Sequence, residues 1–298
     1  MVDARDEALR SALFAHLTQL LARSPDGTVR SADVNALEFE GRRFQVIGQQ
    51  GIRKVAGLEA ALAFTTVYRP PGADRPYEDE LVGGLIRYKY RGTDPQHPDN
   101  RAMRVAMLDR RPMAYFVGVA PGVYVPEFPV FLVDEDPARH DFGVATEEQS
   151  LFNIRDLDDT QKRYVERLTK LRLHQPVFRA KVLRAYDGTC AMCRLRRTEL
   201  IDAAHILEDW HPDSRPVVPN GLALCKIHHA AYDANIVGVR PDLALEIRAD
   251  VLAEVDGPML RHGLQELDGG RLTAPRSRHD RPDEGWLALR YESFRLAG

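Results

Sequence analysis

The residue types best suited to chemistry lie together in one window of this sequence. All three cysteines fall between residues 186 and 236, together with four of the ten histidines. Cys190 and Cys193 form a C-x2-C pair, and Cys225 and His228 form a C-x2-H pair. Thiolate and imidazole ligands at this spacing can bind one ion, and two such pairs complete a tetrahedron. Ordinary buried cysteines would not explain the paired spacing, so the sequence predicts a structural Zn²⁺ site at these four residues.

Three further residues indicate catalysis. His205 and Asn220 lie between the two pairs, and His229 directly follows the second. This order inside paired zinc knuckles resembles the HNH nuclease family over residues 180–240. The resemblance implies a β-hairpin followed by a helix around one divalent metal, with His205 on the first strand as general base. It also implies that His229 is a metal ligand at the start of the helix, and that Asn220 holds the loop before the second strand or orients the base. Phosphodiester hydrolysis needs both a base and a cation.

The second ligand of the catalytic metal is open to alternatives. Many family members carry Asp or His immediately before the base, where this chain has Ala204, which cannot bind metal. Asp233 lies four residues after His229, on the same face of a helix. Asp202 lies two residues before Ala204, on the same face of a strand. We favour Asp233, although an ordinary hydrogen bond also explains either side chain. The C-x2-H spacing assigns His228 to zinc and leaves His229 for a Mg²⁺- or Mn²⁺-type ion.

The N-terminal half carries a pattern of tyrosines among charged residues. Tyr77-Glu78-Asp79-Glu80 precedes Gly83-Gly84, then comes Arg87-Tyr88-Lys89-Tyr90-Arg91-Gly92, and later Asp99-Asn100-Arg101-Ala102-Met103. This order resembles the SET and RING-associated (SRA) domain, which reads modified cytosine in DNA. The loop between the motifs is shorter than in eukaryotic members, so their finger contacts do not transfer to this chain.

The SRA resemblance implies a pocket for a base flipped out of the duplex. Tyr77 and Tyr90 would stack on the base. Glu80, with Asp79 beside it, would accept a hydrogen bond from the cytosine amino group, which thymine lacks. The alternative for Tyr90 is an ordinary strand position with one of two alternating tyrosines in the core. The cations that alternate with the tyrosines predict a face that contacts the DNA backbone: Arg87, Lys89 and Arg91.

The rest of the sequence indicates the elements that position these residues. Leucines at four-residue steps predict a helix over residues 3–23, and another is expected over 98–110. Short β-rich runs predict strands at Phe44–Ile47, Leu85–Tyr90, Met113–Val119 and Phe128–Val133. The acidic segment 134–141 is expected to break the strand pattern and to mark a domain edge. Residues 155–184 are expected to be helical and basic.

These patterns predict an α+β protein. We expect an SRA/PUA-like domain of β-barrel type with an N-terminal helix over residues 1–145, a basic helical linker over 146–180, and an HNH domain of ββα-metal type with structural zinc over 181–298. A chain with 44% hydrophobic and 29% charged residues is typical of folded protein. Its acidic beginning does not resemble a signal peptide, so a cytoplasmic protein is expected. The net charge of −3 excludes a uniformly basic surface.

The combined resemblance is to modification-dependent restriction endonucleases. Such an enzyme would cut double-stranded DNA that carries 5-methylcytosine or a related modified cytosine. One HNH site cuts one strand, so cutting both strands needs two chains or two visits, and we expect a homodimer. Two alternatives remain open. One is an HNH nuclease directed to phosphorothioate DNA or to a specific unmodified sequence. The other is a non-catalytic zinc-containing DNA-binding protein, against which the intact His–Asn–His order counts.

Overall fold

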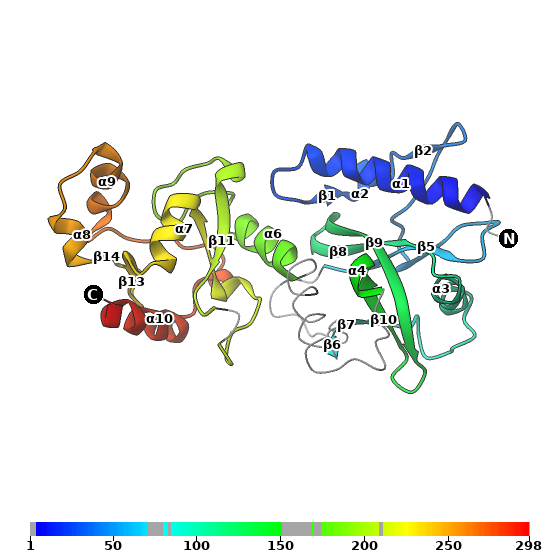
Figure 1. Ribbon diagram of the computed structural model, residues 1–298. Coiled ribbons are helices and arrows are strands. Elements are labelled where there is room, and N and C mark those ends of the chain that lie inside the picture. The colour runs from blue at the N-terminus through cyan, green and yellow to red at the C-terminus, as the bar shows by residue number, and fades with distance from the viewer. Residues whose placement is uncertain are drawn as a thin grey trace. The chain divides into compact units, whose positions relative to one another are not determined.

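The chain divides into two compact units, residues 1–177 and 178–298, each with its own core. The computed structural model describes residues 4–68, 70, 80–82, 85–150, 169, 174–208 and 211–297. It is a mixed α+β structure (Figure 1). Most of the predicted linker, residues 146–180, lies outside the described residues, and its bounds stay a prediction. No helix in the described ranges has the length and apolar character needed to cross a membrane.

The first unit is built on one curled, eight-stranded sheet that forms a half-barrel. Its strands follow the order β4-β5-β8-β9-β10-β7-β6, and β1 pairs with β9 outside this path. Only β5 and β8 run parallel among the described strand pairs of this sheet. The strands are β1 (Val29–Arg30), β4 (Ile52–Lys54), β5 (Ala61–Thr66), β6 (Glu80–Val82), β7 (Leu85–Lys89), β8 (Met113–Ala120), β9 (Val123–Asp136) and β10 (Asp141–Thr146).

Helices lie on the two faces of this sheet. Because side chains alternate along a strand, Met113 and Tyr115 of β8 enter one core, whereas Ala114 and Phe116 enter another. The predicted first helix is confirmed as α1 (Ala4–Ala22), whose leucines belong to the second of these cores (Figure 1). The predicted helix at 98–110 is confirmed as α3 (Pro98–Leu108), which packs into the first core. The short helices are α2 (Ser31–Val34) and α4 (Glu147–Ser150).

Two of the expected strand features are wrong, and polar side chains explain both. Phe44–Ile47 is not a strand, because the Asn35 side chain accepts from the Val46 and Ile47 amides and donates to the Ile47 carbonyl. The nearby hairpin consists instead of β2 (Glu38–Phe39) and β3 (Arg42–Arg43). The acidic segment does not break the strands, since β9 continues to Asp136 and β10 begins at Asp141. The strands predicted around residues 85–90, 113–119 and 128–133 are confirmed in β7, β8 and β9.

The second unit places a β-hairpin and a helix at its centre, as the sequence predicts. Strand β11 (Ile201–His205) pairs antiparallel with β12 (Gly221–Cys225), and α7 (Lys226–Asp233) follows directly. Helix α6 (Gln175–Ala185) and a second hairpin join the same core. The other elements are η3 (Thr198–Leu200), η4 (Val218–Asn220), β13 (Val237–Val239), β14 (Leu245–Ile247), α8 (Ala249–Ala253), α9 (Pro258–Gly263), η5 (Gln265–Leu267), η6 (Arg278–Asp280) and α10 (Glu284–Ala297).

Candidate active site and metal cluster

The four predicted zinc ligands converge in the second unit. The ligand atoms of Cys190, Cys193, Cys225 and His228 all lie within 4.8 Å of one another. The Cys193 and Cys225 sulfurs are 4.0 Å apart, and the His228 Nδ1 lies 3.2 Å from the Cys225 sulfur. A tetrahedral ion with Zn–S bonds of about 2.3 Å has S···S edges of roughly 3.8 Å. The donor set and its spacing therefore fit one tetrahedral metal ion.

The backbone around the cluster holds these ligands in place. In the first knuckle, the Arg194 amide donates to the Cys190 carbonyl, and Arg194 itself adopts a left-handed φ of 61° that closes the turn. In the second, Cys225 ends β12 and precedes α7, so that His228 falls in the first helical turn. The His228 Nε2 lies 2.7 Å from the carbonyl of Gly263, which can accept only from a protonated nitrogen. This contact leaves Nδ1 unprotonated toward the sulfurs, as a metal ligand requires.

Without a cation, the three thiols cannot all ionise. The hydrogen bond from Cys225 lowers the pKa of Cys190 to about 3. The same hydrogen bond raises the pKa of Cys225, and burial raises the pKa of Cys193. A bound divalent ion removes this conflict, because each thiolate then faces positive charge.

His205 ends β11 on the half-buried side of the hairpin. Its ring stacks on Phe178 of α6, with ring centroids 4.1 Å apart and planes 10° apart. Gly221 lies opposite His205 in the strand register. A Cβ at Gly221 would lie 2.4 Å from Val182 and 2.9 Å from the Phe178 ring, so a larger residue would push α6 away. The glycine thus allows Phe178 to fix the plane of the imidazole.

Asn220 is fully buried and holds the loop between the two strands. Its Oδ1 accepts from the Leu207 amide at 2.8 Å, and its Nδ2 donates to the carbonyls of Leu207 and Arg215 and to the Ser214 hydroxyl. Its backbone carbonyl accepts from the Ile206 amide, next to His205. The sequence left two roles open for Asn220, which were to hold the loop or to orient the base. The hydrogen bonds among the described residues are those of a side chain that holds the loop.

The candidate ligands of a catalytic metal differ in their surroundings. His229 and Asp233 lie one turn apart on α7, with the Nε2 of His229 3.4 Å from a carboxylate oxygen of Asp233. Asp202 instead binds Lys226 at 3.1 Å and Arg179 at 3.4 Å. Burial raises the pKa of Asp202, but the hydrogen bond to Lys226 and the charges of Lys226 and Arg179 outweigh it and hold the pKa below its usual value. The geometry therefore offers His229 and Asp233 as a pair that can hold a cation, while Asp202 already has two cationic partners.

The predicted base-pocket residues of the first unit are only partly described. Tyr77 and Asp79 lie outside the described residues. Glu80 begins β6 opposite Arg87 in register, at the edge of the sheet. Tyr90 is buried, with its ring 4.9 Å from Phe142, and its hydroxyl donates to Glu135. Base stacking would require this ring to leave its packing, so the role of Tyr90 stays a prediction.

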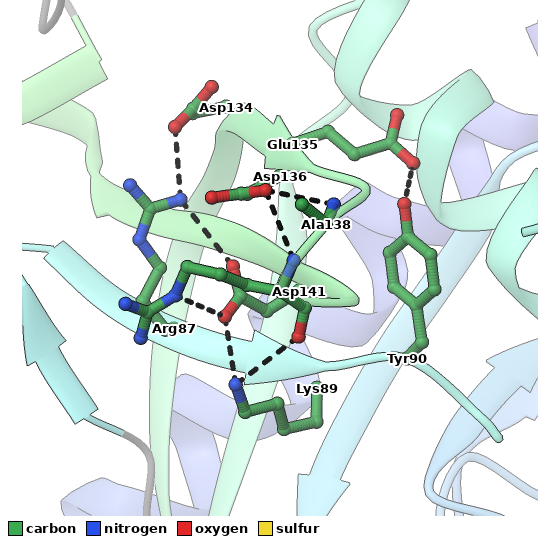
Figure 2. Close-up of polar contacts among 9 residues, drawn as sticks. Arg87, Lys89, Tyr90, Asp134, Glu135, Asp136, Ala138 and Asp141 are labelled. Carbon is green, nitrogen blue, oxygen red and sulfur yellow. Dashed lines mark hydrogen bonds and ion pairs between the residues drawn. The ribbon is translucent and has the colours of Figure 1, made fainter. Parts of the chain in front are cut away.

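The predicted backbone-binding cations of β7 are held by carboxylates. Figure 2 shows Arg87 between Asp134 and Asp141, at 2.9 and 3.7 Å, and Lys89 bound to Asp141 at 2.9 Å. Asp141 is fully buried, and it lies opposite Lys89 in the β10–β7 register. Arg91 forms its own ion pair with Asp99 at 2.5 Å. The role of these three cations in DNA binding stays a prediction.

Glu135 is a further, partly buried carboxylate in this region. Arg104 binds its carboxylate at 2.6 Å, and the Tyr90 hydroxyl donates to it. Burial raises the pKa of Tyr90, the bond to Glu135 raises it further, and together they bring it to about 12. The phenol therefore remains a donor at neutral pH.

Part of the second unit matches a known protein family. Residues 190–240 match the sequence model of the HNH endonuclease family, and this span contains the four cluster residues together with His205, Asn220 and His229. The matched part of the chain is thus similar to an HNH endonuclease domain, and we call it the HNH domain. No curated protein sequence matches the chain.

Two solved structures show a weak overall likeness. One is described as "Modification dependent TagI restriction endonuclease"; it is 17% identical, with a TM-score of 0.32, covering 82% of this chain and 85% of that one. Another is described as "Structure of the Type IV phosphorothioation-dependent restriction endonuclease ScoMcrA"; it is 17% identical, with a TM-score of 0.23, covering 61% of this chain and 48% of that one.

The HNH domain also depends on residues that sequence reasoning missed. Phe178 supports the His205 ring from a helix that precedes the domain, and Gly263 accepts from His228 from a helix that follows it. No spacing rule links either residue to its partner. The one available signal is Gly221, since a glycine inside an otherwise apolar strand indicates close approach by another element.

Proposed function

We propose that the chain is a metal-dependent DNA endonuclease whose HNH domain hydrolyses the phosphodiester backbone, with His205 as general base. The observation that supports this most is the placement of His205 at the end of β11, with its ring fixed by Phe178 and its loop held by Asn220, inside a domain that matches the HNH family. A fixed imidazole beside a rigid loop is the arrangement that a general base needs.

In the proposed reaction, His205 takes a proton from water as the water oxygen bonds to phosphorus. The bond from phosphorus to the 3′-oxygen then breaks. His229 and Asp233 would hold a divalent ion of Mg²⁺ or Mn²⁺ type, which supplies positive charge for the leaving oxygen. Asn220 keeps the loop that follows His205 in one conformation. Zinc at the Cys3His cluster would serve structure, because all four positions are filled by protein ligands.

We further propose that the first unit selects DNA carrying 5-methylcytosine by base flipping. The support comes from the order of Tyr77, Asp79, Glu80 and Tyr90 in the sequence and from the position of Glu80 in the edge strand of the sheet. The Tyr90 ring would have to rearrange to stack on a base. The two alternatives, phosphorothioate and unmodified DNA, call for the same nuclease chemistry and differ only in the first unit. A homodimer is proposed for cutting both strands.

The test of the catalytic proposal is plasmid nicking with Mg²⁺, Mn²⁺ or EDTA. Since removal of a general base costs about 10²–10⁴-fold, His205→Ala is expected to lose cleavage while DNA binding survives. His211→Ala, which changes a histidine of the neighbouring loop, is the matched control. Nicking by His205→Ala at the wild-type rate would refute the base assignment, and a non-catalytic DNA-binding protein would not nick with any of the metals.

The test of selectivity is digestion of matched duplexes. One sequence is prepared unmodified, with 5-methylcytosine, and with phosphorothioate linkages. Preferential cutting of the methylated duplex supports the proposed target. Equal cutting of all three, or preference for the phosphorothioate duplex, refutes the methylcytosine proposal and leaves the HNH chemistry in place.

A further inference from the structure

A segment beyond the HNH match connects two parts of the HNH domain. The amide of Thr273 donates to the carbonyl of Ala191, between the first two cysteines, at 2.8 Å. The amide of Asp283 donates to the carbonyl of Pro219, directly before Asn220, at 3.0 Å. We call residues 271–283 the strap. Because both anchors are backbone hydrogen bonds, the strap runs from the metal cluster to the loop that Asn220 holds.

The strap presents arginines to solvent. Residues 271–283 contain four arginines and two carboxylates, Asp280 and Asp283, so the charge is 4 − 2 = +2 with His279 neutral. Leu272 and Pro275 are buried, whereas Arg276 and Arg278 are exposed. Neither guanidinium group has a hydrogen bond or ion pair within the part of the chain that the structure describes. The apolar residues thus attach the strap, and its charges remain available.

Three more exposed arginines lie near the first anchor. Arg194, Arg196 and Arg197 follow Cys193 in the knuckle turn, again without an ion pair among the described residues. Arg194 and Arg276 are each three residues from the Ala191–Thr273 hydrogen bond. Three residues span at most about 10 Å of chain. The knuckle arginines therefore extend the positive charge of the strap toward the metal cluster.

We propose that the strap is a binding site for the phosphate backbone of duplex DNA, next to the strand that the HNH domain cuts. Guanidinium groups bind phosphate oxygens bidentately, and a backbone fixed at both ends presents them at low entropic cost. A positive segment is notable in a chain whose net charge is −3. The proposal rests on the proposed nuclease function for its partner, but it makes a separate prediction about binding.

The test is the salt dependence of duplex binding by the full chain. Each phosphate contact contributes about 0.9 to the slope of log affinity against log salt concentration. The double variant Arg276→Gln, Arg278→Gln is expected to lower the slope by about 1.8, equally on methylated and unmodified duplex. Fluorescence anisotropy without added Mg²⁺ or Mn²⁺ keeps the DNA intact. The control is Arg240→Gln, Arg295→Gln, which removes the same formal charge from the exposed surface around Tyr291, where Arg240 pairs with Asp242 and Arg295 has no ion pair among the described residues.

The outcomes separate this proposal from the nuclease proposal. A lower slope in the strap variant and an unchanged slope in the control support the strap as a phosphate site, whether or not the chain cuts DNA. An unchanged slope in the strap variant, or an equal fall in both variants, overturns it. Metal content and thermal unfolding of both variants check that the fold is intact. If the slope falls but His205→Ala nicks normally, the strap site stands and the proposed catalytic base fails.

Discussion

The two units hold their charged and ligand-type side chains in opposite ways. In the first, Lys89 meets the buried carboxylate of Asp141, and Arg87 meets both Asp141 and the partly buried Asp134. In the second, three thiols and an imidazole converge with no cation of the protein's own, and the strap arginines have no carboxylate partner in the described residues. The cations of β7 are thus paired within the first unit, whereas the cluster offers a full set of ligands for a metal ion and the strap arginines present unpaired charge at the surface. An arginine or lysine side chain can bind DNA phosphate readily only where no carboxylate of the protein already pairs with it.

The largest expected difference between the two units follows from loss of the metal ion. Cys193→Ser is expected to unfold the second unit and leave the first intact, because zinc binding contributes on the order of 10 kcal/mol to such folds. Cys193 is the exposed cysteine of the cluster, so the change removes a ligand with little loss of packing. Zinc content and limited proteolysis measure the effect. A zinc-free protein with both units resistant to protease would contradict the prediction.

The next effect concerns the buried carboxylate of the first unit. Asp141→Asn removes the buried carboxylate that Lys89 pairs with, while Arg87 keeps Asp134, and is expected to cost about 3–5 kcal/mol in the free energy of unfolding. Asp136→Asn is the control, because among the described residues Asp136 accepts only from turn amides, which the Asn oxygen can still do, and the change should cost at most about 1 kcal/mol. Urea unfolding compares the two. Equal costs would show that the pairing around Asp141 is not what stabilises the sheet.

The substitution Lys89→Gln tests directly whether a paired cation of the first unit contacts DNA. Since Lys89 is already paired with Asp141, we expect the salt dependence of DNA binding to stay unchanged while stability falls. A fall of about 0.9 in the slope of log affinity against log salt would instead show that Lys89 contacts a phosphate. That result would restore the predicted backbone-binding face of β7.

The smallest expected effect is a pH dependence that belongs to the first unit. Burial raises the pKa of Glu135, but its hydrogen bonds from Arg104 and Tyr90 outweigh this and hold the pKa below its usual value. A lowered pKa gives stability that is present above the unfolded value near ~4.3 and is lost as pH falls through the folded value. Glu135→Gln should remove this part of the acid sensitivity in unfolding measured from pH 7 downward. An unchanged pH profile would argue against it.

The sequence predicted those elements and metal ligands that are set by residues close together in the chain. The knuckles, α1 and α3 follow from residues a few positions apart, and the hairpin-then-helix order came from the resemblance to the HNH family. The same rules failed where a distant side chain intervenes. Asn35 takes the hydrogen bonds that a strand at Phe44–Ile47 would have made. Asp141 lies beside Lys89 only because the fold places β10 next to β7, and so alternation alone made β7 look like an open basic face.

The hydrogen bond between His228 and Gly263 helps to determine how long a segment must be transferred when this domain is fused to another protein. A graft of residues 190–240 alone would carry every matched HNH residue, yet leave behind Gly263, Phe178 and the strap anchors at Thr273 and Asp283. The zinc ligand would lose its acceptor and the base its stacking partner. A chimera with a different N-terminal unit should therefore join at the start of α6 and keep the chain through α10, because this piece is more than twice as long as the matched span.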